Sequence, residues 1–170
     1  MVGWDLSIPL THWVTLTCFK RCLLYSHVPI LARREQTLLD ALIFNWLIGN
    51  NDAHGKNFSL VYRGEVSSGL QTRLAPLYDL ISTVYYPELS PKMAMKLGGE
   101  YLSERIAPAN FERLAEEAGL AKPMMKRRVW ELAEAVVSKV LTVTTDHPVT
   151  VAVAKVIRSR CERKITSFKV

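Results

Sequence analysis

The fold of this chain is decided by residues 44–60, which read FNWLIGNNDAHGKNFSL. Almost every residue from 38 to 48 is apolar, which predicts a helix buried on most of its circumference. Thr37 and Asp40 have the spacing of a capping pair at the start of this helix. Gly49 and the two asparagines after it predict its end, since these residues tolerate left-handed backbone. A buried helix should therefore give the polar loop at its end a rigid support.

The loop after this helix concentrates side chains that suit phosphate chemistry. Asp52 and Asn57 have the spacing of the catalytic Asp and the metal-binding Asn in the kinase pattern D-x-x-x-x-N. His54 and Lys56 stand between them, near enough to contact phosphate oxygens. The pattern is short, so its meaning depends on the neighbouring residues.

The residues after the loop predict a hairpin. Residues 58–62 have the composition of a strand, 63–69 that of a polar turn, and 70–77 that of another extended run. This run leads to Tyr78 and Asp79. A hairpin here would return the chain to the loop and bring an additional carboxylate to it.

Phosphoryl transfer explains these residue types. Mg²⁺ prefers oxygen ligands, which the Asp79 carboxylate and the Asn57 amide would supply. Asp52 would orient the acceptor hydroxyl and take its proton. Taken alone, Asp79 before Ser82 and Thr83 would better fit the cap of a helical turn. Together with the loop, the metal role is the better interpretation.

Three segments resemble the HipA family of bacterial serine/threonine kinases, which are toxins of type II toxin–antitoxin modules implicated in persistence: residues 46–59, 74–83 and 93–99. The resemblance implies a mainly α-helical fold with a small β-hairpin, the C-terminal lobe of a kinase-like protein. We assign residues 36–170 to this lobe and leave residues 1–35 unassigned.

The resemblance also implies specific roles. Asp52 matches the catalytic aspartate, and Asn57 and Asp79 match the ligands of Mg²⁺. The implied partners are a HipB-like DNA-binding antitoxin, through which any DNA contact would be indirect, and a protein substrate such as an aminoacyl-tRNA synthetase. The residues that match the ATP-contacting segments are His54, Gly55, Lys56, Asn57, Tyr78 and Asp79.

Longer members of this family carry a phosphate-binding loop and an ATP-positioning lysine in an N-terminal lobe. Here Gly3 is the only glycine before Gly49, so no glycine-rich loop precedes the predicted helix. We therefore expect a truncated lobe, or one that needs another polypeptide, with little kinase activity by itself.

Other functions fit these residues less fully. A non-catalytic module would bind an antitoxin or DNA through basic helices, which the net charge of +6 and the pI near 9.3 permit. A metal-dependent phosphohydrolase would use Asp52, His54 and Asp79, but such enzymes usually need more histidine or carboxylate ligands.

The C-terminal part of the chain predicts helices. One begins at Pro108 and closes at Gly119. Another places Met125, Val129, Leu132, Val136 and Val140 on one apolar face. The last begins near Pro148, with Val151, Ala154, Ile157, Cys161 and Ile165 inward and Lys155, Arg158, Arg163 and Lys164 mostly outward.

Composition supports a soluble globular domain in the cytoplasm. The chain is 49% hydrophobic and 22% charged, and no signal peptide is visible. The apolar stretch at 38–48 is too short to span a bilayer, so no membrane association is expected. Cys18, Cys22 and Cys161 are best explained as reduced thiols. A helix around residues 13–25 is one interpretation of the N-terminal segment.

Overall fold

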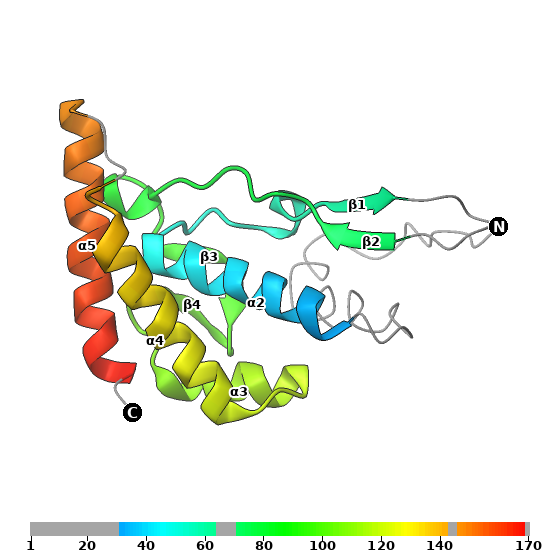
Figure 1. Cartoon of the computed structure of the whole chain (residues 1–170). Helices are drawn as coiled ribbons and strands as arrows, with labels where there is room; N and C mark the ends of the chain where they lie inside the picture. The colour runs from blue at the N-terminus through cyan, green and yellow to red at the C-terminus, as the bar shows by residue number, and fades with distance from the viewer. Residues whose placement is uncertain (1–30, 64–70, 143–145, 169–170) are drawn as a thin grey trace.

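The structure is a computed structural model that describes residues 31–63, 71–142 and 146–168. Predictions for the N-terminal helix at 13–25, for Cys18 and Cys22 and for the turn at 64–70 lie outside these ranges. The elements follow one another in the order α2 (Leu31–Ile48), η2 (Gly55–Asn57), β1 (Leu60–Arg63), β2 (Gln71–Leu74), η3 (Thr83–Tyr85), β3 (Lys92–Leu97), β4 (Glu100–Leu102), α3 (Pro108–Ala118), α4 (Lys122–Lys139) and α5 (Pro148–Phe168) (Figure 1).

Helix α2 lies at the centre of the molecule and is longer than the sequence pattern predicts. It begins at Leu31 rather than near residue 38, because the added residues LARREQT are mostly strong helix formers. The predicted capping pair is wrong: Thr37 and Asp40 lie inside the helix. The buried face is confirmed, since no residue from 38 to 48 is exposed. The helix ends at Gly49, whose φ of 73° is left-handed.

The predicted hairpin is confirmed as the antiparallel pair β1–β2, in which Leu60 faces Leu74. Its first strand starts at Leu60, two residues later than the sequence pattern suggests. Strands β3 and β4 form a further antiparallel hairpin. Its turn is made by Gly98 and Gly99, both with positive φ. The fold is therefore mainly α-helical with small hairpins, as expected.

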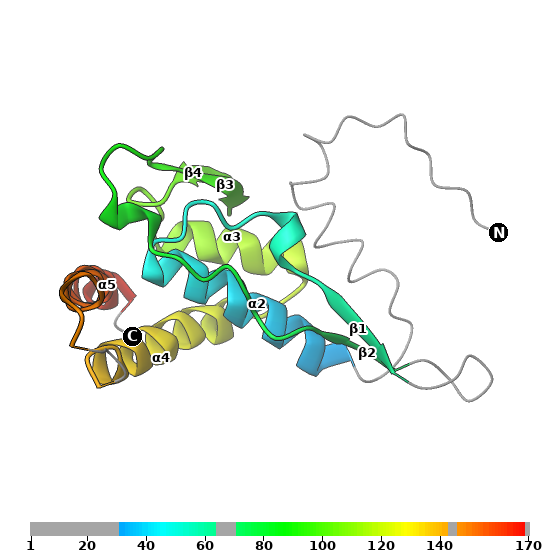
Figure 2. The ribbon, with the colours of Figure 1, turned by 90° about the horizontal axis from the view of Figure 1, so that it is seen from above.

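The core lies between α2 and the C-terminal helices. Helix α2 contacts α4 and α5, and α3 contacts α4 and β3. Trp46 of α2, Phe111 of α3 and Phe168 of α5 meet edge to face, with ring centroids 5.0 to 5.9 Å apart. Figure 2 shows α5 end-on, on the side of the molecule away from the β1–β2 hairpin. The core thus joins both ends of the described chain.

The C-terminal helices confirm most of the predicted pattern. Helix α3 begins at Pro108 and closes at Gly119, whose φ is 68°. Met125 and Val129 are buried in α4 as expected, whereas Val140 lies just beyond the end of that helix. In the part of the chain that the structure describes, no helix has the length and apolarity needed to cross a membrane.

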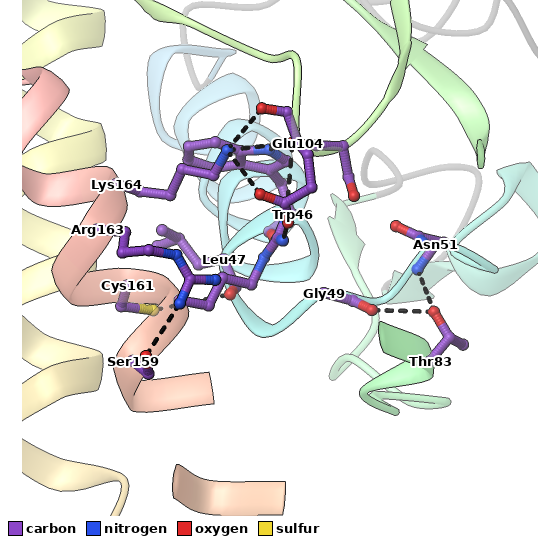
Figure 3. Close-up of polar contacts among 12 residues, drawn as sticks. Trp46, Leu47, Gly49, Asn51, Thr83, Glu104, Ser159, Cys161, Arg163 and Lys164 are labelled. Atoms are coloured by element: carbon purple, nitrogen blue, oxygen red, sulfur yellow. Dashed lines mark hydrogen bonds and ion pairs between the residues drawn. The ribbon is translucent and has the colours of Figure 1, made fainter. Parts of the chain in front are cut away.

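The basic residues of α5 are not all on the outside. Lys164 was expected to point outward, but it is 9% exposed, and Arg160 beside it is also buried. The Lys164 ammonium donates to the Glu104 carbonyl at 3.1 Å and lies 5.4 Å from the centre of the Trp46 ring. Both cations pair with the Glu104 carboxylate. Figure 3 shows Lys164 beside Glu104. The turn before α3 supplies acceptors that allow these cations to be buried.

Candidate active site

Helix α2 delivers the polar loop directly from its buried end. The loop closes on itself: the His54 amide donates to Asn57 Oδ1, and the Asn57 amide donates to the His54 carbonyl, both at 2.9 Å. Asn57 is buried, His54 is half-buried, and Asp52 and Lys56 are exposed. A fixed amide therefore lies beneath side chains that are accessible to a ligand.

The chain returns to this loop after the β1–β2 hairpin. Figures 1 and 2 show the segment after β2 running back past α2 toward the end where that helix stops. The Ala75 amide donates to the Ser59 carbonyl at 2.7 Å, which holds this segment beside the loop. Asn57 Nδ2 then donates to Asp79 Oδ2 at 2.5 Å. The proposed metal ligands, 22 residues apart in sequence, are thus in direct contact.

Asp52 is connected to Asp79 through the side chain of Asn50. The Asn50 amide group donates to the Asp79 carbonyl at 2.9 Å, and its oxygen accepts the Asp52 amide at 3.2 Å. The same segment is fixed further along by Thr83, whose hydroxyl donates to the Gly49 carbonyl and accepts the Asn51 amide (Figure 3). The structure therefore places residues 52 and 79 on one side of the molecule.

Tyr78 closes the outer edge of the site. Its hydroxyl donates to the Lys56 carbonyl at 2.5 Å and shares a hydrogen bond of 2.9 Å with Ser59 Oγ. Every residue predicted for the site therefore lies on the loop 50–59 or on the returning segment 75–83. The roles assigned to these residues stay predictions.

The backbone of Asp79 is strained. Its φ is 57°, and among the described residues it is the only non-glycine residue with a positive φ. Left-handed backbone costs an L-residue about 1–2 kcal/mol, although Asp tolerates it better than most. Such strain persists where the surrounding structure holds the residue, and it concentrates at functional sites.

The alternative explanation of this segment as a simple helix cap fails. Ser82 precedes η3 but makes no side-chain capping bond. The Asp79 carboxylate bonds to Asn57 rather than to a helix terminus. Among the described residues, the buried atoms without a hydrogen-bond partner include Ser82 Oγ and His54 Nδ1. Buried polar atoms of this kind call for a partner, and a bound ligand can supply one.

The donor set suits a magnesium ion that also binds phosphate. Asp79 offers an exposed carboxylate, and Asn57 offers an amide beside it. Mg²⁺ commonly takes one or two protein ligands and fills its other positions with water and phosphate oxygens. Within the described ranges, no group of three or more His, Cys, Asp or Glu side chains could hold a metal ion. Asp52, His54 and Asp79 therefore do not form the centre that a phosphohydrolase would need.

The sequence pattern did not predict that asparagines join these parts, although it placed Asn50 at the end of the helix. Asn45 and Asn50 are buried at 4% and 2% exposure, and they bond to each other. In the sequence, Asn45 interrupts an apolar helix and Asn50 follows a helix-ending glycine. The polar residue on a buried helical face was the available signal, since a buried amide must have hydrogen-bond partners.

Comparisons with known proteins agree with this geometry. Residues 17–140 match the family described as the HipA-like C-terminal domain, so the match includes part of the segment left unassigned above. The protein Y4mE of Sinorhizobium fredii, named as a candidate kinase, is 44% identical over 109 residues, which is 64% of this chain and 25% of that protein. The serine/threonine-protein kinase toxin HipA of Shewanella oneidensis is 29% identical over 99 residues, 58% of this chain and 22% of the toxin.

A solved structure gives the same result for the fold. The Shewanella oneidensis HipA chain, in a complex with HipB and its operator DNA, superimposes with a TM-score of 0.67 at 25% identity. The match covers 82% of this chain and 33% of that one. This chain spans about a quarter of the length of the curated relatives named above.

Proposed function

Because this chain belongs to the HipA-like C-terminal domain family, we propose that it supplies the catalytic loop and the metal ligands of an ATP-dependent serine/threonine protein kinase. The observation that carries the proposal is the contact between Asn57 and Asp79, with Asp52 joined to the same point through Asn50. A base and two oxygen ligands on one side of the molecule are the parts that this reaction needs.

Each residue has a role that its position supports. Asp52 is exposed and its backbone is held, so its carboxylate can accept a proton from a bound hydroxyl. Asp79 and Asn57 would hold Mg²⁺, which neutralises charge on the nucleotide phosphates when bound. Asn57 presents its NH₂ group to Asp79 and its oxygen to His54. For Asn57 and Asp79 to bind one cation together, the Asn57 side-chain amide must therefore rotate so that its oxygen faces the cation. His54, Gly55, Lys56 and Tyr78 would line the nucleotide.

The proposed partner is a HipB-like DNA-binding antitoxin, and DNA would be contacted through it. The support is the Shewanella oneidensis complex, in which HipA is found with HipB and operator DNA. Direct DNA binding by α5 has less support, because Lys164 and Arg160 face the core and Arg158 pairs with Glu162.

The first substrate to test is an aminoacyl-tRNA synthetase. The cytoplasm provides ATP and keeps a free thiol such as Cys161 reduced.

A chimera tests the proposal most directly. This chain would replace the matching third of the Shewanella oneidensis HipA chain, which supplies the rest of a kinase. We expect transfer of radiolabelled γ-phosphate, reduced at least about 100-fold by Asp52→Asn. Asp79→Asn removes a carboxylate ligand, so it should lower the transfer rate and raise the Mg²⁺ concentration needed for half-maximal transfer. Asp146→Asn changes an exposed acid before α5 and should leave the rate unchanged.

The same experiment separates the alternative of a non-catalytic interaction module. The HipB complex of the relative gives that alternative its support. An interaction module would keep antitoxin binding, and any toxicity on expression, in the Asp52→Asn variant. For the 170-residue chain by itself we expect little phosphate transfer. Micromolar ATP binding with transfer by the chain alone would contradict this expectation.

A further inference from the structure

We infer that Asn50 is a positioning residue that fixes Asp79 relative to the loop of Asp52. The inference rests on the proposed function, in which Asp79 is a metal ligand. Asn50 is 2% exposed, and its side chain bonds to three residues: the nearby Asn45 and Asp52, and the distant Asp79. The amide group donates to Asn45 Oδ1 at 2.8 Å and to the Asp79 carbonyl at 2.9 Å, and the oxygen accepts the Asp52 amide at 3.2 Å.

The inner support of Asn50 is the end of helix α2. Asn45 donates from its own side chain to the Ala41 carbonyl at 2.9 Å, and the Asn50 backbone amide donates to the Asn45 carbonyl at 2.8 Å. Asn45 is also buried. Because both amide hydrogens and the oxygen of Asn50 are engaged, its side chain is held in one orientation. Asn50 thereby holds the Asp79 carbonyl and the Asp52 amide in a fixed position relative to the end of α2.

The outer contact of Asn50 is the strained residue Asp79. The bond joins residues 29 apart in sequence, so it is not part of a local turn. Asn50 holds the carbonyl of Asp79, while Asn57 holds its carboxylate. Thr83 secures the same segment four residues later through Gly49 and Asn51 (Figure 3), but it does not touch Asp79. Asn50 is therefore the contact that maintains the left-handed backbone of Asp79.

Loss of this contact has a defined consequence. Without the Asn50 donor, the Asp79 carbonyl loses a bond from a buried group, and the backbone can relax from its strained conformation. The carboxylate would then turn away from Asn57 while the core of the protein remains folded. A residue that acts only through general stability would not have this local effect.

The first measurement is nuclear magnetic resonance of the metal-free chain. In Asn50→Ala we expect the side-chain amide protons of Asn57 to exchange with water at least about tenfold faster, because their acceptor has moved. The matched control is Asn51→Ala, which removes a neighbouring buried amide that donates to Ser90 and not to Asp79. The control should leave this exchange unchanged. Unchanged exchange in Asn50→Ala would overturn the inference, whatever the metal does.

The second measurement is binding of Mn²⁺ alone, followed by electron paramagnetic resonance. Loss of an outer contact to a metal ligand typically weakens affinity about 10–100-fold, so we expect about tenfold weaker binding in Asn50→Ala. Asn51→Ala should stay within about twofold of the original chain. If Asp79→Asn weakens binding and Asn50→Ala does not, the inference fails while the proposed metal site stands. If Asp79→Asn has no effect, the metal role fails and proton exchange alone decides the role of Asn50.

A further variant covers the case in which Asn50→Ala does not fold. Asn45→Ala places a strong helix former in α2 and removes the inner acceptor of Asn50 without touching Asp79. We expect faster exchange of the Asn57 amide here as well, by a smaller factor. An unchanged rate in a folded Asn45→Ala protein would then overturn the inference.

Discussion

At the scale of single residues, the molecule depends on buried polar groups that meet specific acceptors. The Ser103 carbonyl accepts the Trp46 indole at 3.0 Å and lies within 3.5 Å of donors on Arg160 and Lys164. Burial lowers the pKa of Lys164 to about 8, and the nearby charges of Arg160 and Arg163 act in the same direction. The folded protein therefore holds this proton less tightly than the unfolded chain does.

Lys164 predicts a dependence of stability on pH. Its pKa is about 8 when folded and 10.5 ordinarily, so the unfolded chain binds more protons as pH rises above 8. The free energy of unfolding should then rise by about 1 kcal/mol between pH 7 and pH 9. Above pH 9 the Cys161 thiol opposes this rise, because burial raises its pKa to about 11 and it ionises first in the unfolded chain.

Urea titrations at pH 7, 8 and 9 measure this rise. It should disappear in Lys164→Met, which removes the buried ammonium, and persist in Lys155→Met, which changes an exposed lysine of the same helix. A rise of equal size in Lys164→Met would show that another group causes it.

At the scale of elements, helix α2 is held to α4 by an ion pair. Arg128 donates to both carboxylate oxygens of Asp40, at 2.6 and 2.8 Å. Each side chain is only 26% exposed, and Asp40 raises the pKa of Arg128. Paired bonds of this kind are stronger and more directional than single ones. Asp40 lies inside α2, and its carboxylate bonds to α4 instead of capping the start of its own helix.

A double-mutant cycle on Arg128 and Asp40 should give a coupling energy of about 1 kcal/mol. The comparison pair is Arg158 and Glu162, which lie on the surface of α5 at 44% and 50% exposure. Its coupling should be about 0.3–0.5 kcal/mol. Both cycles can be measured by chemical unfolding, and equal coupling energies would contradict the assignment of a structural role to the inner pair.

At the scale of the whole molecule, the aromatic cluster connects helices that are distant in the sequence. Phe111 is fully buried and contacts Trp46 and Phe168, whose ring centroids lie 5.0 and 5.3 Å away. Trp46 is also close to the end of α2, from which the site loop begins. The cluster therefore fixes the support on which the site is built.

Phe111→Ala should lower the free energy of unfolding by about 3–5 kcal/mol, since it removes contacts and leaves a cavity. That is a large share of the roughly 5–15 kcal/mol that stabilises an ordinary domain. Leu89→Ala removes an apolar side chain that is 48% exposed and should cost no more than about 0.5 kcal/mol. Urea unfolding followed by circular dichroism measures both. A loss below about 1 kcal/mol in Phe111→Ala would contradict the central place of the cluster.

The local structure around the site follows from the amino-acid sequence alone. The apolar run at 38–48 required a buried helix, Gly49 required its end, and the strand-like runs on either side of a polar turn required a hairpin. These features depend on neighbours in the chain, so periodicity and turn residues are enough to find them. The order of Asp52, Asn57 and Asp79 along the chain is also a property of the sequence.

Which of these groups meet depends on the packing of the whole molecule. The contact of Asn57 with Asp79, the bond of Asn50 to the Asp79 carbonyl and the inward position of Lys164 all join residues far apart in sequence. Asp tolerates left-handed backbone better than most residues, but its residue type alone does not predict the positive φ of Asp79. Such contacts depend on how helices and hairpins pack, because an amide or ammonium becomes buried only where another segment offers it an acceptor.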